Sequence, residues 1–294
     1  MQRYIKNLTL GLIIVIMLAE AAQAQSSVWV IKGARSSIYL AGSCHVLRSS
    51  DYPLPDEFET AYIQSPHIIF ETPPGDLNTM EYLEKLMAIA VYNDGTTIKE
   101  HLTTDVYSKV EKFCNLRNHP FKQYQSFRPW MLSMTLVMRE MERLGVKEDS
   151  GVDRFFYHKA IKDGKVTGGL ETADEQLVFF KLIDVSMGNE QVSETVDYLL
   201  HLDNKVQDIL NSWRKGDEAA VEAFSLREIK NYPQLYSALI VDRNRKWAKK
   251  IENLIHGDRS VMVIVGVAHL VGKDSVVDLL RKSGYQVTKL RNGR

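Results

Sequence analysis

Two histidines sit in the same local pattern at opposite ends of the chain. Each follows an apolar run that ends in Gly-x-x-His, first as Gly42-Ser-Cys-His45 and again as Gly266-Val-Ala-His269. A glycine at the end of a strand allows a sharp turn and close backbone approach. The histidine then projects from the carboxyl end of the strand, where open α/β sheets bind their ligands. The repeated pattern therefore predicts that both imidazoles belong to one site.

Two glutamates end apolar runs in a matching way. Glu71-Thr72 follows Ile68-Ile-Phe, and Glu171-Thr172 follows Gly168-Gly-Leu. Imidazoles and carboxylates together suit Zn²⁺, Mn²⁺ or Co²⁺, and such a cation lowers the pKa of bound water toward neutrality. We predict metal ligands at His45, His269 and Glu171, and a catalytic role for Glu71. The pattern leaves open which glutamate is a ligand and which is a general base.

The two cysteines admit more than one interpretation. Cys44 stands next to His45, which suggests a cysteine hydrolase, but adjacent residues at the end of a strand point to opposite sides and are poorly placed for proton transfer. Cys44 and Cys114 could form a disulfide in an oxidising compartment. Because spacing alone does not establish bridge geometry, we favour two unpaired thiols over that disulfide.

The elements that must hold these residues form a simple succession. β-rich runs lie toward both ends of the chain, and helical periodicity fills most of the middle. The predicted strands cover residues 28–32, 37–41, 67–70, 165–170, 261–265 and 285–290. The predicted helices cover residues 79–92, 104–117, 129–144, 151–161, 173–185, most of 190–255 with breaks near Gly216 and Pro233, and 273–283. We expect one α/β (α+β) domain, with a central mixed sheet built from both ends of the chain and a large helical middle.

The composition excludes several classes of protein. The chain has 294 residues, with 37 Lys and Arg against 37 Asp and Glu, and hydrophobic residues make up 45%. This apolar content argues against disorder, and two cysteines are too few for a disulfide-stapled fold. A net charge of zero gives no electrostatic reason to expect a nucleic acid or an anionic membrane surface as a partner. The oligomeric state stays open.

The first 24 residues have the features of a secretory signal. Arg3 and Lys6 precede an apolar run from Leu8 to Leu18, and Ala22-Gln-Ala24 is typical of a cleavage site. The alternative is a transmembrane anchor, but the run falls short of the roughly 20 apolar residues that a spanning helix needs. We therefore expect a signal peptide at residues 1–24, a mature domain at 25–294 in the periplasm or outside the cell, and no stable membrane anchor after cleavage.

The motifs together resemble the TraB/GumN family. The resemblance runs in the family's order over nearly all of the mature chain, although Ser43-Cys44 replaces the threonine and aliphatic residue that relatives often have. It rests on Tyr39-Leu-Ala-Gly-Ser-Cys-His45, Tyr52-Pro-Leu-Pro55, Ile69-Phe-Glu71, Gly151-Val-Asp153, the segment from Gly169 to Gln176, Arg243-Asn244 before a tryptophan, and Val265-Gly-Val-Ala-His-Leu-Val-Gly272.

The resemblance implies a fold, a chemistry and a set of site residues. It implies a domain of two related halves, shared with the Tiki proteins, which are described as metal-dependent proteases, and more distantly with erythromycin-esterase-like and ChaN-like proteins. Carried over by position, the active centre comprises His45, His269 and Glu71, with Glu171 as a fourth candidate.

Two further charged residues belong to the matched motifs. Arg243 occupies a family position, and a guanidinium there would stabilise an oxyanion, although a structural ion pair is an equal alternative. Asp153 could support a ligand histidine, but we expect it to be a helix-terminal acid.

The leading prediction is an exported, peptidase-like hydrolase that uses a divalent metal, with a peptide or small acyl compound as substrate. One alternative is a non-catalytic periplasmic protein that binds a metal, a haem-like ligand or a peptide. The other is a metal-free esterase with Glu71 as its base.

Overall fold

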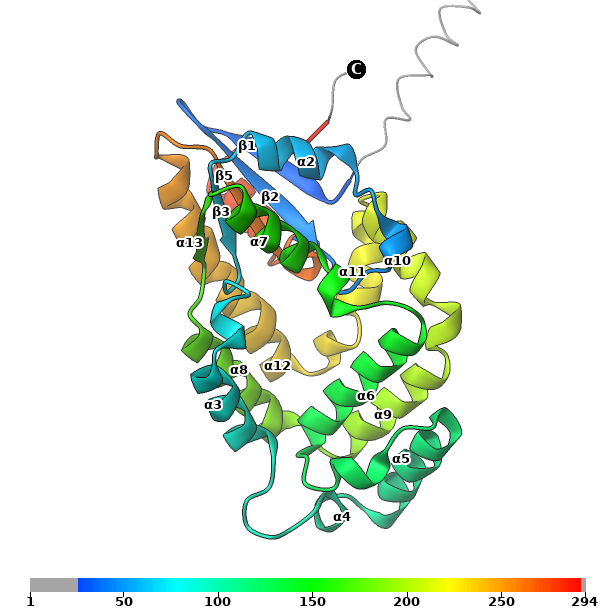
Figure 1. Cartoon of the computed structure of the whole chain (residues 1–294). Coiled ribbons are helices and arrows are strands. Elements are labelled where there is room, and N and C mark those ends of the chain that lie inside the picture. The colour runs from blue at the N-terminus through cyan, green and yellow to red at the C-terminus, as the bar shows by residue number, and fades with distance from the viewer. Residues whose placement is uncertain (1–25, 292–294) are drawn as a thin grey trace, which may run out of the picture.

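One mixed sheet gathers both ends of the chain. The computed structural model describes residues 26–291, so the predicted signal peptide lies outside the described residues. The strands are β1 (Val28–Lys32), β2 (Ser37–Ser43), β3 (His67–Phe70), β4 (Val166–Gly169), β5 (Val261–Gly266) and β6 (Val287–Lys289), in the order β4-β3-β5-β2-β1-β6. The predicted mixed sheet with a large helical middle is confirmed (Figure 1). The last strand is shorter than expected.

The central strands run parallel and end together. β5 lies between β2 and β3 and is parallel to both, and β4 is parallel to β3. The hairpin of β1 and β2 is antiparallel, and β6 adds to its outer side. The four parallel strands therefore present their carboxyl ends at one edge of the sheet, where ligands bind in α/β folds.

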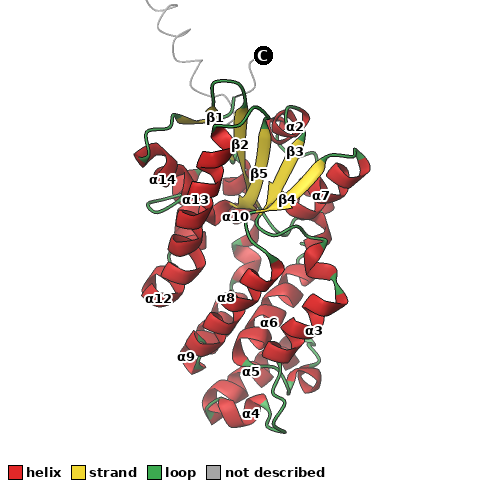
Figure 2. Ribbon diagram, turned by 90° about the vertical axis from the view of Figure 1, so that its left-hand side faces the viewer, coloured by secondary structure: helices red, strands yellow, loops and turns green. Residues whose placement is uncertain are grey.

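Helices cover both faces of the sheet. Helices α2 (Asp56–Ile63) and α7 (Val152–Lys162) pack against one face, whereas α13 (Asp242–Ile255) and α14 (Val276–Lys282) pack against the other (Figure 2). The central strands β2, β3 and β5 are largely apolar runs, as expected where a sheet is buried on both sides. All six residues of β5 are buried.

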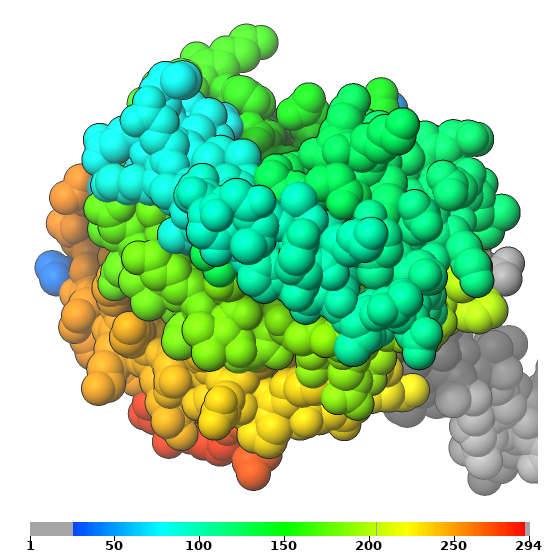
Figure 3. All heavy atoms as spheres, turned by 90° about the horizontal axis from the view of Figure 1, so that it is seen from below, coloured from blue at the N-terminus to red at the C-terminus, as the bar shows by residue number. Residues whose placement is uncertain are grey.

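The helical middle lies beyond the carboxyl ends of the parallel strands (Figures 1 and 2). It begins with α3 (Met80–Ala90), α4 (Ile98–His101), α5 (Thr104–Arg117) and α6 (Pro129–Arg143), and continues with α8 (Ala173–Ser186) and α9 (Asn189–Leu200). From below, α3 to α5, α8 with α9, and the α12–α13 region lie side by side over this end of the molecule (Figure 3). Pro129 is the first residue of α6, and Gly145, with a φ of 75°, follows its end, as the sequence predicts.

The predicted helical stretch of residues 190–255 is divided more often than expected. Besides α9 and α13 it contains α10 (Val206–Arg214), α11 (Glu218–Leu226) and α12 (Pro233–Tyr236). The expected breaks near Gly216 and Pro233 are present, and a 3-10 turn at Leu202–Asn204 adds another. A π-helical segment at Ser237–Val241 joins α12 to α13.

Within residues 26–291, no helix is both long enough and apolar enough to span a membrane.

Candidate active site

Three predicted site residues meet at the carboxyl ends of the central strands. His45 follows β2, Glu71 follows β3, and His269 lies in the 3-10 turn after β5. Because β2 and β3 both pair with β5, the register places the three strand ends side by side. Residues that are more than 190 positions apart in the sequence thus share one site.

Gly266 marks the point on which these side chains converge. A methyl group built on its Cα would lie 2.9 Å from His45 Nε2, 3.2 Å from Glu71 Oε1 and 3.7 Å from His269 Cδ2. Only glycine leaves this small space open, because any side chain would press against the imidazole and the carboxylate. The glycine of the second Gly-x-x-His pattern therefore has a steric role in the site.

Glu71 is held as an anion. Its Oε1 accepts a hydrogen bond of 2.6 Å from the Gly266 backbone N–H, and its Oε2 accepts one of 2.7 Å from Arg243 Nη2. Burial alone would raise its pKa, but the nearby Arg243 charge, the two histidines and the Gly266 N–H outweigh burial and lower the pKa to about 2. Glu71 is therefore ionised at neutral pH.

Arg243 is clamped between two aromatic rings and two carboxylates. Its guanidinium carbon lies 4.8 Å from the centre of the Phe179 ring and 4.6 Å from that of Trp247. Its Nε donates to Glu171 at 3.0 Å, and its Nη2 donates to both Glu71 and Glu171. The contacts of Nη1 are longer, at 3.5 Å to the Leu239 carbonyl and 3.4 Å to His269 Nε2.

Glu171 is held by two side chains of α13. The carboxylate is buried and accepts hydrogen bonds from Arg243 and from Trp247 Nε1, the latter at 2.9 Å. Donors therefore contact both of its oxygens, and Glu171 is a hydrogen-bonded partner of Arg243 in this structure. The matching Glu-Thr ends of the strands hid this arrangement, because each glutamate is oriented by contacts with α13 that no local pattern encodes.

His45 is the exposed member of the site, and its side chain is 59% accessible to solvent. Its Nδ1 lies 2.8 Å from Asp153 Oδ2, and the same carboxylate oxygen accepts a hydrogen bond from Ser43 Oγ. Asp153 is chiefly responsible for raising the pKa of His45 to about 9. The expectation that Asp153 is only a helix-terminal acid is therefore wrong: it lies in the first turn of α7 and also contacts His45.

His269 is the buried member, with 5% of its surface exposed. Its Nδ1 lies 2.7 Å from Asn244 Oδ1, and its ring packs against Trp247 with centres 4.5 Å apart. Its Nε2 is 4.0 Å from Glu71 Oε1. Burial is the main cause that lowers its pKa to about 3, so the imidazole is neutral at physiological pH.

The cysteines are not positioned for catalysis. Both thiols are free, as we favoured. Cys44 Sγ donates to the Val46 carbonyl at 3.2 Å, and burial raises its pKa to about 12. A thiol with such a pKa is not a nucleophile at neutral pH, so the geometry does not support the cysteine-hydrolase alternative.

The donors fit a divalent cation by their chemistry. Two imidazoles and one ionised carboxylate face the space beside Gly266, and this is a usual ligand set for Zn²⁺ and its neighbours once His45 has released its proton. In residues 26–291, however, no group of three His, Cys, Asp or Glu side chains is already arranged to hold an ion.

The sequence did not single out several residues of the site. Phe179 and Trp247 enclose Arg243, and Asn244 contacts His269. Asn244 and Trp247 stand in and just after the Arg243-Asn244 motif, which was the one signal that could have found them. Phe179 carries no comparable signal because it lies within an ordinary helical pattern.

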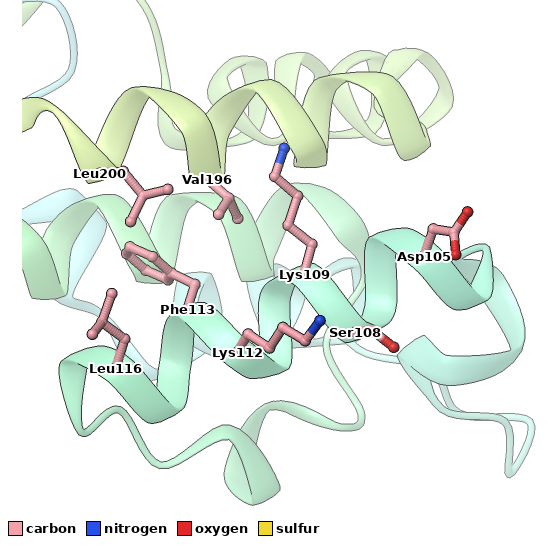
Figure 4. A pocket seen from close by; sticks show the side chains of 8 residues that line it. All are labelled: Asp105, Ser108, Lys109, Lys112, Phe113, Leu116, Val196 and Leu200. Carbon is pink, nitrogen blue, oxygen red and sulfur yellow. The ribbon is translucent and has the colours of Figure 1, made fainter.

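A surface groove between α5 and α9 lies apart from these residues. Its apolar side chains gather at one end and its polar side chains at the other (Figure 4). It is lined by Asp105, Ser108, Lys109, Lys112, Phe113, Leu116, Val196 and Leu200, none of which belongs to the site.

The mixed sheet and its His–Glu–His strand ends define an α/β protein whose candidate site lies at the carboxyl ends of its parallel strands. The chain belongs to the TraB/PrgY/gumN family, whose sequence profile matches residues 27–289. It is 22% identical to the human protein named metalloprotease TIKI1 over 94% of this chain and 64% of the relative. It is 23% identical to zebrafish metalloprotease TIKI2 and 21% identical to the Nematostella vectensis metalloprotease TIKI homolog, in each case over 89% of this chain.

The chain spans about 60–66% of the length of these relatives. No solved structure matches it.

Proposed function

We propose that this chain is an exported metal-dependent hydrolase, peptidase-like, that cleaves an acyl bond in a peptide or a small acyl compound. The observation that carries the proposal is the convergence of His45 Nε2, Glu71 Oε1 and the His269 ring on the space beside Gly266. The metalloprotease names of the relatives support the same class of reaction.

His45, Glu71 and His269 would hold a divalent cation, Mn²⁺, Co²⁺ or Zn²⁺, which supplies a Lewis acid that lowers the pKa of water toward neutrality. We assign Glu71 as a ligand rather than a general base. A carboxylate with a pKa of about 2 stays ionised but accepts protons poorly near neutral pH. Arg243 and the Gly266 N–H fix the position of this carboxylate.

Arg243 has one nitrogen left for the reaction. Nε and Nη2 are committed to the two glutamates, whereas Nη1 makes only long contacts. Nη1 is therefore the atom from which Arg243 would stabilise a developing oxyanion, as preorganised donors do in other hydrolases. Asp153 would hold the His45 ring through Nδ1 and leave Nε2 toward the site.

The experiment fills the space beside Gly266. Gly266→Ala should lower the affinity for Co²⁺ or Zn²⁺ by at least ~10-fold, the range in which disturbed metal sites respond. The matched control is Gly168→Ala in β4, because a methyl group there meets nothing within 4 Å. Metal content after dialysis is the measurement, and the His45→Ala, His269→Ala double variant sets the baseline. Full metal binding by Gly266→Ala or by the double variant would contradict the proposed site.

Turnover separates the remaining alternatives. The metal-loaded protein should cleave members of a peptide and ester library, and a chelator should abolish that cleavage. Metal binding without any cleavage would instead favour the non-catalytic binding protein. Cleavage that persists in chelator would favour a metal-free esterase.

A further inference from the structure

We infer that Asn244 is a positioning residue that determines which ring nitrogen of His269 carries the proton. No charge is involved, and the contact is buried. Asn244 lies in α13 with none of its surface exposed, and His269 lies in the turn after β5. Its consequence for metal binding rests on the proposed function, whereas its effect on the imidazole does not.

The orientation of the Asn244 amide is fixed by a second partner. Its Nδ2 donates a hydrogen bond of 2.8 Å to the Asp274 carbonyl. The backbone of Asp274 is fixed by a hydrogen bond of 3.1 Å from its N–H to Asp278 Oδ2. It adopts a left-handed conformation with a φ of 70°. A flipped amide would set its oxygen against this carbonyl oxygen. The Asn244 oxygen must therefore be the atom that faces His269.

An amide oxygen can only accept a hydrogen bond. His269 Nδ1, at 2.7 Å from Asn244 Oδ1, must therefore carry the proton of the neutral ring. The other ring nitrogen, Nε2, then keeps a lone pair. Arg243 Nη1, which can only donate, faces Nε2 at 3.4 Å and agrees with this assignment.

Both histidines are contacted at Nδ1, but His45 faces a carboxylate and His269 faces an amide. His45 is also contacted through Nδ1, but by the carboxylate of Asp153. His269 is buried beside Glu71, and Glu171 lies on the far side of Arg243. An amide at position 244 fixes the ring without adding a third carboxylate to this buried cluster.

The test compares two substitutions that separate the two hydrogen bonds of Asn244. Asn244→Asp keeps an oxygen for His269 Nδ1 and loses the donor to the Asp274 carbonyl, whereas Asn244→Leu has a similar size and loses both. The control is Ser275→Ala. Ser275 Oγ accepts from the Asp278 N–H at 3.0 Å, so its loss loosens the same segment without touching His269.

The first readout is the nitrogen NMR signature of ¹⁵N-labelled histidine in the metal-free full-length protein. The wild type and Ser275→Ala should show His269 with a protonated Nδ1 and an unprotonated Nε2, and Asn244→Asp should keep Nδ1 protonated. Asn244→Leu should show a mixture of the two neutral forms. The second readout is Co²⁺ affinity, which should fall about 10- to 100-fold in Asn244→Leu and by only a few-fold in Asn244→Asp.

Two results would overturn the inference. One is an unchanged His269 signature in folded Asn244→Leu, and the other is a mixture of forms in Ser275→Ala as large as that in Asn244→Leu. If the wild type binds no metal, the proposed function fails, but the NMR comparison still decides whether Asn244 positions His269.

Discussion

Arg243 joins the parts of the site at the scale of single residues. One guanidinium contacts both glutamates and faces His269, and two rings restrict its movement. Its surroundings divide the two glutamates, which look equivalent in the sequence. Glu71 has one oxygen on the Gly266 side of the site, whereas Glu171 is enclosed by Arg243 and Trp247.

This difference predicts unlike effects of removing each charge. Glu171→Gln should lower the free energy of unfolding by about 3 kcal/mol, because it leaves the buried Arg243 without one of its two anionic partners. Metal affinity should change little. Glu71→Gln, the matched substitution, should instead reduce metal affinity strongly. Urea unfolding and metal titration of both variants measure the two effects, and a larger loss of metal affinity in Glu171→Gln would support Glu171 as a ligand.

At the scale of elements, the site depends on how closely α7 approaches the segment after β2. Gly151 caps the amino end of α7, and a methyl group on it would lie 2.1 Å from the His45 carbonyl oxygen. The Val152 N–H donates to the Cys44 carbonyl at 3.1 Å across the same contact. This approach brings Asp153 to His45. On the other face, the π-helical segment that precedes α13 leads directly into Asp242 and Arg243.

Gly151→Ala should therefore separate α7 from His45. Because the clash is with backbone atoms that have no alternative position, we expect a loss of about 3 kcal/mol in the free energy of unfolding together with weaker metal binding. Gly188→Ala is the matched control, since Gly188 caps α9 and a methyl group there meets only Gln191 Oε1, at 3.4 Å. Thermal unfolding and metal titration report both quantities. Equal behaviour of the two variants would show that the close approach of α7 is not needed.

At the scale of the whole molecule, Lys289 ties the last strand to the first described residues. Its ammonium donates to the Ser26 carbonyl at 2.9 Å and to the Gly216 carbonyl at 3.3 Å, and it lies 3.6 Å from the centre of the Trp29 ring. Burial is the largest cause that lowers its pKa, to about 8, although Glu218 opposes this effect. The closure of the sheet thus includes a buried cation.

This buried cation predicts a pH dependence of stability. Between about pH 8 and the ordinary lysine pKa of 10.5, the unfolded chain binds a proton that the folded chain does not. The free energy of unfolding should therefore rise with pH in this range, by on the order of 2–3 kcal/mol relative to Lys289→Met. Urea unfolding from pH 7.5 to 10 measures the difference. The wild type should show no such rise relative to Lys282→Met, because Lys282 is exposed and its pKa is raised. A constant difference between the wild type and Lys289→Met would contradict the role of Lys289.

The sequence by itself determined the elements and the three converging site residues. Short β-rich runs in the sequence predict all six strands. The Gly-x-x-His and Glu-Thr endings mark where His45, Glu71 and His269 follow the strands. These signals are local, because each depends on neighbouring residues within one element. They extend to the family, whose motifs are contiguous stretches of sequence.

The tertiary structure alone decided the partner of each charge. Glu171 could not be separated from Glu71, and Asp153 could not be recognised as the partner of His45, because the contacts that distinguish them join residues 72 and 108 positions apart. Asn244 reaches His269 only because α13 packs against the sheet beside β5. Hydrogen bonds and ion pairs act over about 3 Å, and only the packing of helices on the sheet brings such distant groups within that range.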